Sequence, residues 1–342
     1  MPVVIEMRPK TRWFVSLSLA VVLLLPAAFG WWALRPIALA QAPLEVSVHV
    51  GSTARSAARQ VHEQGAGLSP ALFALLARLA GDATRLQAGN YLIDAGTSPW
   101  QLLQRMVRGG GRLLKLTVPE GWNYAQLLAA LAHAPGLVDD VAGLDGAQIM
   151  QRIGAPAGLQ PEGWFFPDTY MYAPGSSASA LLARGYHAMR HQLEQAWAQR
   201  APDLPLRDPE QALTLASIVE RETGRAEDRA RVASVFVNRL RAGMPLQSDP
   251  TVIYALGPRY DGSLHRADMR VDSPYNTYVH DGLPPTPIAL PGAAAIDATL
   301  HPAPGHALYF VARGDGGSAF SDTLRQHDAA IDRYMIKRKP AR

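Results

Sequence analysis

Two glutamates, Glu220 and Glu222, stand in the otherwise apolar segment LTLASIVERETG, residues 213–224. A carboxylate surrounded by leucine, isoleucine, valine and alanine side chains is disfavoured in its charged form, so its pKa should rise. A carboxyl group that keeps its proton near neutral pH can act as a general acid and protonate a leaving group. This segment is therefore the first candidate for an active site.

The two glutamates lie on a predicted helix. Asp208 is a suitable N-cap, Pro209 suits the first turn, and Gly224 is a natural stop. Side chains two positions apart on a helix point about 200° apart, so Glu220 and Glu222 cannot act as a pair in one site. The helical wheel alone does not choose between them, and a solvent-exposed position stays an alternative for either.

The N-terminus predicts a membrane anchor. Residues 13–34 carry no charge and would span about 33 Å as a helix, enough for a bilayer core. Basic residues in the tail, 1–12, orient that tail toward the cytoplasm, and tryptophans stand at both ends of the run. A cleaved signal peptide is the alternative, with a small-residue pattern at 38–40, but the apolar run is longer than a usual signal core. We expect an uncleaved anchor in the inner membrane and a periplasmic body.

Composition excludes several kinds of chemistry. The chain has no cysteine, which excludes disulfides, thiolate catalysis and cysteine-ligated metals. His187 and His191 have the spacing of zinc ligands but lack an HExxH motif, so a solvated helix face is the better interpretation. We expect no metal and no cofactor.

The basic pI of 9.4 comes from the two ends of the chain. Residues 1–12 carry a net charge of +2 and residues 337–342 carry +4, which leaves −2 for the part between them. No basic stripe with interleaved aromatic residues appears there, so the sequence predicts no nucleic-acid partner.

Hydrophobic periodicity predicts an α+β fold in two parts. Residues 41–108 form a small module, a plain spacer being the alternative, with strands at 44–50 and 86–93 and helices ending near 61, 79 and 108. Residues 112–336 form a larger domain, with strands at 113–118 and 307–312, and helices at 124–133, 177–200 and 321–334. A pair of helices is expected within 135–159.

Several uncommon motifs occur together and in one order. They are PEGWFFPDTYMY, ASIVERETG, VASVFVNRL, MPLQSDPTVIYALG, SPYNTYVHDGLPPTPIALPG, HPA and LYFVARGDGGSAFS. Together they resemble the catalytic core of the endolytic murein transglycosylases, the MltG or YceG-like family, over most of the chain after residue 44. The resemblance also implies the family's single membrane anchor and a LysM-like peptidoglycan-binding module, which fits residues 41–108.

The resemblance implies the site residues. The family's catalytic glutamate is the first in the IVExE motif, which is Glu220 here. Ser248 stands where threonine is equally common in the family, and the hydroxyl is kept. The polar residues expected around the glycan cleft are Asn238, Gln247, Ser248, Asp249, Thr251, Tyr275, Asn276 and Tyr278. Two of these, Asp249 and Asn276, stand beside turn residues and have a role in loop formation as the alternative.

The implied activity is cleavage of peptidoglycan glycan strands from within, without water. A single glutamate protonates the glycosidic oxygen and then deprotonates the C6 hydroxyl of N-acetylmuramic acid, which closes a 1,6-anhydro ring. The resemblance further implies action beside peptidoglycan synthases (penicillin-binding proteins), as a terminator of strand growth. The alternatives are a muramidase that uses water and a membrane-anchored scaffold that binds peptidoglycan without cleaving it.

Overall fold

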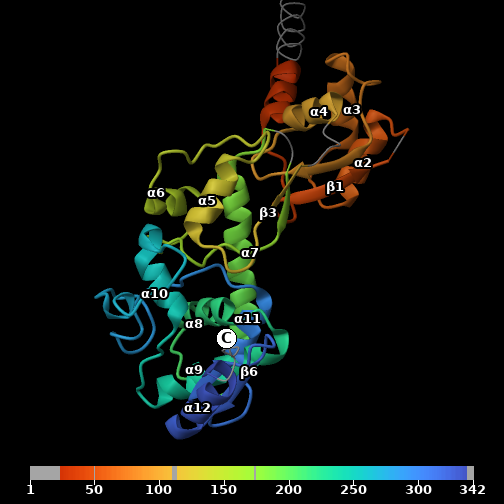
Figure 1. Cartoon of the computed structure of the whole chain (residues 1–342). Coiled ribbons are helices and arrows are strands. Elements are labelled where there is room, and N and C mark those ends of the chain that lie inside the picture. The colour runs from red at the N-terminus through yellow and green to blue at the C-terminus, as the bar shows by residue number, and fades with distance from the viewer. Residues whose placement is uncertain (1–23, 50, 110–113, 173–174, 337–342) are drawn as a thin grey trace, which may run out of the picture. The chain divides into compact units, whose positions relative to one another are not determined.

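The computed structural model describes residues 24–49, 51–109, 114–172 and 175–336 (Figure 1). The chain divides into two compact units, residues 1–114 with 171–175, and residues 115–170 with 176–342. Residues 24–34 are helical, whereas 13–23 of the predicted anchor lie outside the described residues. Within the described ranges, no helix has the length and apolarity needed to cross a membrane.

The first unit contains the small module. Strands β1 and β2 pair antiparallel, with Leu44 opposite Ile93 and Val48 opposite Gly89. Alternate residues of β1 are buried, as its apolar–polar alternation predicts. The order of strands and helices agrees with the sequence prediction: β1 (Leu44–Val48), α2 (Ala54–Glu63), α3 (Pro70–Leu79), β2 (Gly89–Ile93) and α4 (Pro99–Arg108).

Side-chain caps explain where the module's helices begin. The hydroxyls of Thr53, Ser69 and Ser98 accept hydrogen bonds from backbone N–H groups in the first turns of α2, α3 and α4. Helix α4 ends at Gly109, whose left-handed backbone suits glycine. The three helices and the sheet enclose one apolar core, in which Phe73 and Met106 are fully buried.

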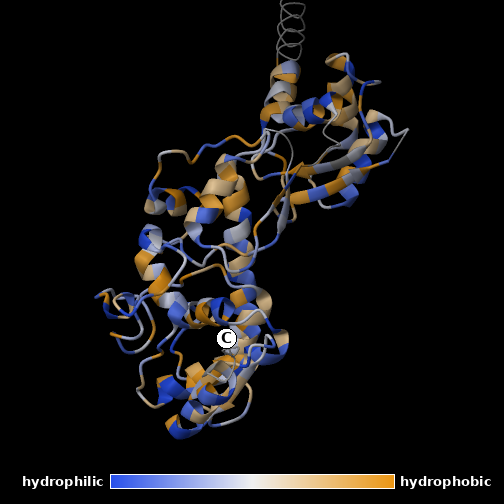
Figure 2. Cartoon of the chain, in the orientation of Figure 1, coloured by the Kyte–Doolittle hydropathy of each residue, from blue (hydrophilic) through white to orange (hydrophobic). Residues whose placement is uncertain are grey.

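The second unit is mainly helical. Its helices are α5 (Tyr124–Ala132), α6 (Gly146–Arg152), α7 (Ala178–Ala198), α8 (Pro209–Glu222), α9 (Ala226–Arg241), α10 (Asp249–Leu256), α11 (Ala293–Leu300) and α12 (Leu324–Ile331). Short 3-10 turns follow α10 at Gly257–Arg259 and Asp268–Arg270, and a π-helical turn, Asp332–Ile336, follows α12. Figure 2 shows apolar and hydrophilic residues following one another along these helices.

The remaining strands form two small sheets. Strand β3 (Leu114–Thr117) pairs with β4 (Thr169–Tyr172), and β5 (Tyr309–Ala312) pairs antiparallel with β6 (Ser318–Ser321). The mixture of helices and strands confirms the predicted α+β class. The expected helix pair within 135–159 is wrong, because only α6 forms there. Gly136 and Gly143 both adopt positive φ, which interrupts the chain before α6.

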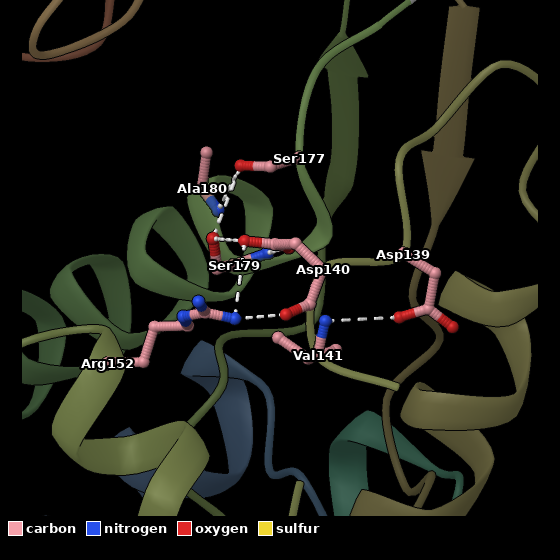
Figure 3. A network of polar contacts seen from close by, with 7 residues as sticks. All are labelled: Asp139, Asp140, Val141, Arg152, Ser177, Ser179 and Ala180. Atoms are coloured by element: carbon pink, nitrogen blue, oxygen red, sulfur yellow. Dashed lines mark hydrogen bonds and ion pairs between the residues drawn. The ribbon is translucent and has the colours of Figure 1, made fainter. Parts of the chain in front are cut away.

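A polar network holds the start of α7 in place (Figure 3). The backbone N–H of Ser179 donates to Asp140 Oδ1 at 2.9 Å, and the Ser179 hydroxyl donates to the other carboxylate oxygen. Arg152 of α6 forms an ion pair with the same carboxylate at 3.8 Å. The network fixes the first turn of α7, the long helix that contacts α8.

Helix α8 lies in the core of the second unit and contacts α7, α9, α10 and α11. Its residues from Ala212 to Val219 are all buried, whereas Glu220 and Glu222 in its last turn are only partly buried. The apolar part of the helix therefore holds the two glutamates at a fixed position on the edge of the core.

Candidate active site

The last turn of α8 directs its two glutamates to different surroundings. Asp208 accepts a hydrogen bond from the N–H of Gln211 at 2.8 Å and caps the helix as predicted. The helix ends at Glu222, and Thr223 already has an extended backbone. Glu220 and Glu222 contact different segments, as their spacing on a helix requires.

Glu220 supports the start of α11. Its Oε2 accepts a hydrogen bond from the N–H of Gly292 at 3.0 Å. Burial raises the pKa of Glu220 and the nearby Glu120 raises it further, while the Gly292 hydrogen bond, Arg229 and Arg221 act in the opposite direction. A Cβ atom at position 292 would lie 1.8 Å from Glu120 Oε1, so glycine allows the two carboxyl groups to meet this backbone.

Glu222 faces a cavity. Its Oε1 accepts a hydrogen bond of 2.6 Å from the Ser248 hydroxyl. Burial raises the pKa of Glu222 to about 7 and Asp249 adds to the rise, whereas the Ser248 hydrogen bond and Arg239 lower it. The cavity has a volume of about 380 Å³ and is lined by Glu222, Arg239, Leu246, Gln247, Asp249, Tyr278, Tyr309, Phe310, Leu324 and His327.

Four of the eight predicted cleft residues gather around Glu222. Gln247, Asp249 and Tyr278 line the cavity, and Ser248 binds the Glu222 carboxyl group directly. The Tyr278 hydroxyl donates to Asp249 Oδ1 at 2.6 Å, which orients the Asp249 carboxylate. Glu220 is not among the described residues that line this cavity.

The other four predicted residues have supporting contacts. Thr251 donates to the Ser248 carbonyl at 2.6 Å and so stands behind Ser248. The amide of Asn238 donates to the carbonyls of residues 305 and 307. The amide of Asn276 donates to the carbonyls of residues 269 and 271, which is the loop-forming role. Tyr275 packs against Tyr254 and hydrogen bonds to Thr286.

Sequence reasoning missed three polar residues of the cavity wall, Arg239, Tyr309 and His327. Arg239 is 7% exposed and comes from the VNRL motif; a charged residue on the buried face of an amphipathic helix was the available signal. Tyr309 of β5 and His327 of α12 stack at 5.2 Å between ring centroids. Nothing local in the sequence indicates that these two residues, some 90 positions or more after α8, meet Glu222.

A larger cavity, of about 770 Å³, lies elsewhere in the second unit. Trp164, Tyr186 and Leu193 line it together with an ion pair between Arg190 and Glu194. It contains neither Glu220, nor Glu222, nor any predicted cleft residue. Its size alone does not make it the site of chemistry, and we place the candidate active site at Glu222.

The pKa of Glu222 predicts how the folded state responds to pH. Below pH 4.5 its carboxyl group is protonated in both the folded and the unfolded chain. As pH rises toward 7 the unfolded chain ionises first, so the folded state loses up to about 3 kcal/mol of relative stability. Glu222→Gln removes this loss. Its melting temperature should exceed that of the wild type at pH 8, and the difference should shrink at pH 5. A difference that does not change with pH would contradict the raised pKa.

Comparisons with known proteins agree on one family. A model of the YceG-like family matches residues 46–333. The chain is 33% identical over 270 residues to the endolytic murein transglycosylase of Bacillus subtilis (strain 168), over 74% of each chain. It is 25% identical over 363 residues to the endolytic murein transglycosylase of Streptococcus pneumoniae serotype 2 (strain D39), over 93% of this chain but 65% of that relative.

A solved structure supports the same conclusion. The chain is similar to a YceG-like protein from Listeria monocytogenes with a TM-score of 0.52 and 28% sequence identity, over 84% of this chain and 98% of that one. The family model covers all the motifs that the sequence brought together, from β1 to the end of α12. This chain belongs to the YceG-like family.

Proposed function

We propose that this protein is an endolytic murein transglycosylase in which Glu222 is the general acid and base. The observation that carries the proposal is a partly protonated carboxyl group, with a pKa of about 7, on the wall of a 380 Å³ cavity. The names of the curated relatives from Bacillus and Streptococcus give the activity. The geometry favours Glu222 over Glu220, because Glu222 is the glutamate that meets the predicted cleft residues.

The reaction needs one group that first gives and then takes a proton. Protonated Glu222 transfers its proton to the glycosidic oxygen between N-acetylmuramic acid and N-acetylglucosamine, and the bond from that oxygen to C1 breaks. The resulting carboxylate takes the proton of the muramic acid C6 hydroxyl, and O6 bonds to C1 to form the 1,6-anhydro ring. Glu222 regains its proton and no water is consumed. A pKa near 7 makes both forms accessible at neutral pH.

Neighbouring side chains hold this group in position. The Ser248 hydroxyl fixes one carboxyl oxygen of Glu222, which leaves the other to face substrate. The Asp249 carboxylate shares the cavity and is held by Tyr278. A negative charge there would favour the positive charge that develops at C1 when the glycosidic bond breaks.

The presence of Asp249 also supports a second candidate function. Glycosidases that use water carry two carboxyl groups on one site, and Glu222 and Asp249 share this cavity. Mass spectrometry of the products from purified glycan strands separates the two reactions. We expect 1,6-anhydro ends, each lighter by one water than the reducing ends of a hydrolase. Reducing ends would contradict our proposal and show that the protein is a muramidase. Uncleaved strands would show that it is a scaffold that binds peptidoglycan.

The same proposal extends to the protein's place in the cell. We propose that residues 13–34 anchor the chain in the inner membrane, with the catalytic unit in the periplasm. Residues 41–108 act as a LysM-like module that holds peptidoglycan, and the enzyme works beside the synthases that polymerise glycan. The uncharged run, the basic tail before it and the strand–helix order of the module support these assignments.

His327 is expected to bind substrate in this cavity. Burial lowers the pKa of His327 and Arg239 adds to the effect, against an opposing rise from Asp328, so the ring is mainly neutral at pH 7. Its Nδ1 is buried and has no hydrogen-bond partner among the described residues. An unpaired acceptor costs less there than an unpaired N–H, so Nε2 carries the proton and donates to a sugar oxygen.

Substitution tests this role. His327→Phe keeps the stacking on Tyr309 but removes the donor, and should raise KM about 5–10-fold, the value of one hydrogen bond, with kcat little changed. His327→Gln restores an N–H donor and should recover part of the loss. Steady-state kinetics on glycan strands of defined length measures both. Equal KM for the wild type and the phenylalanine variant would exclude the contact.

A further inference from the structure

Helix α3 exposes an apolar stripe. Leu72, Leu75 and Leu79 follow one another at helical spacing and are 37%, 43% and 69% exposed. The opposite face of the helix, which includes Phe73 and Ala77, is buried in the module's core. Helix α3 is therefore apolar on both sides, which a helix on a solvated surface seldom is.

Helix α2 gives a direct comparison, because it packs against α3 and covers the same core. Its outward side chains include Arg55, Arg59 and Glu63, and all three are exposed. The two helices have the same length and similar buried faces. The outer face of α2 is suited to water, and that of α3 is suited to an apolar partner.

The module is fixed against the end of the predicted membrane anchor. Phe29 and Trp32, in helical residues 24–34, pack against the core cluster that contains α3 and α4, and Ala33 is buried in it. Just after this helix, the N–H of Ile37 donates to the carbonyl of Thr97, before α4, at 2.8 Å. The module therefore begins beside the anchor's last turns and not beyond them.

This packing sets the depth of the module. From residue 29 to residue 34 a helix rises about 7.5 Å, and a headgroup layer is roughly 5–8 Å thick. If residues 13–34 span the hydrocarbon core, residue 34 lies at its outer boundary, and the part of the module that touches Phe29 lies at or just inside that boundary. An apolar face at that level can contact the ends of the acyl chains nearest the headgroups. An arginine beside it, such as Arg78, can bind lipid phosphates.

We propose that the outer face of α3, formed by Leu72, Leu75 and Leu79, rests in the outer surface of the membrane in which the chain is anchored. Lipid is the favoured occupant because the face belongs to the same unit as the anchor's last turns, whose Phe29 and Trp32 pack against the core that α3 covers. The inference depends on the proposed anchor and is independent of the proposed glycan chemistry. It gives the module a fixed orientation on the membrane, beyond tethering through a single helix.

The absence of cysteine makes a clean test available. Single cysteines are introduced into the full chain as Leu75→Cys and Leu79→Cys, and labelled with an environment-sensitive fluorophore in nanodiscs that contain anionic lipid. Arg59→Cys on α2 is the matched control in the same module, and Val21→Cys within the anchor is the positive control. Quenching by nitroxide lipids labelled near the headgroup is compared with quenching by aqueous iodide.

We expect the labels at 75 and 79 to be quenched by nitroxide lipid severalfold more than the label at 59, and less by iodide. If position 21 is quenched by lipid but 75 and 79 behave like 59, the anchor stands and the lipid contact is excluded. If 75 and 79 are shielded from both quenchers, a protein covers the face and the proposal fails. If position 21 is not quenched, the anchor itself is excluded and the inference falls with it.

Discussion

Replacing Glu222 with glutamine is expected to lower kcat on purified glycan strands by at least 10²–10⁴-fold, the usual contribution of a positioned proton donor. Glutamine has nearly the same shape and can still accept the Ser248 hydrogen bond, but it has no proton to transfer. Release of anhydromuramic ends, followed by liquid chromatography and mass spectrometry, measures the loss. The melting temperature of the variant shows that the fold is intact.

Glu220→Gln is the matched control, two residues earlier on the same helix. Its amide oxygen can still accept from the Gly292 N–H, so α11 should keep its start and most activity should remain. The opposite result, an inactive Glu220 variant beside an active Glu222 variant, would return the catalytic role to the first glutamate of the IVExE motif.

The pH dependence of the reaction gives a further check: the wild-type rate should fall as pH rises through about 7, because the acid must be protonated before it can act.

The choice between these two glutamates shows where local sequence stops being informative. Asp208, Pro209 and the apolar run predict helix α8 and its start correctly, because caps and periodicity are local properties. They also predict that the glutamates face different ways. They do not say which one faces a cavity, since that depends on the distant segments that reach the end of the helix: Ser248 meets Glu222, and Gly292 meets Glu220.

The polar residues of the predicted cleft illustrate a second limit. Asn238 and Asn276 have the side chains expected of sugar-binding groups, but both bind carbonyls of irregular segments. Such segments leave backbone acceptors without partners, and an amide side chain is a good donor for them. Sequence cannot separate a sugar-binding role from a backbone-binding role when donor and acceptor are 67 positions apart, as for Asn238 and Gly305.

Arg239→Met is expected to destabilise the second unit and to disable the cavity. The guanidinium group donates from Nε to the Leu308 carbonyl at 2.7 Å. From one terminal nitrogen it donates to the carbonyls of Pro245 and Leu246 and to Gln247 Oε1, at 2.9–3.1 Å. It thus joins the residue before β5 to the turn that carries Gln247, whose φ of 53° is unfavourable for a residue with a side chain.

Methionine fills similar space but leaves these buried acceptors unpaired. We therefore expect the free energy of unfolding to fall by roughly 2–4 kcal/mol. For a unit of this size the loss corresponds to a fall in melting temperature of about 5–15 °C. Activity should fall as well, because Gln247 and Tyr309 both line the cavity that Glu222 faces. Arg239→Lys keeps the charge but not the planar set of guanidinium donors. Its melting temperature and activity should lie between those of the wild type and Arg239→Met.

Arg241→Met is the control, because Arg241 lies on the same helix, is exposed, and donates to the Asp203 carbonyl at 3.0 Å and to Asn238 Oδ1 at 3.5 Å. Its melting temperature should change by about 2 °C or less. If Arg239→Met melted and cleaved glycan like Arg241→Met, the guanidinium would not hold the cavity wall. The turn at Gln247 would then need another source of rigidity. Because the Arg239 contacts join segments about 60 residues apart, a fall in activity larger than the fall in stability would show that wall geometry, and not folding alone, limits the reaction.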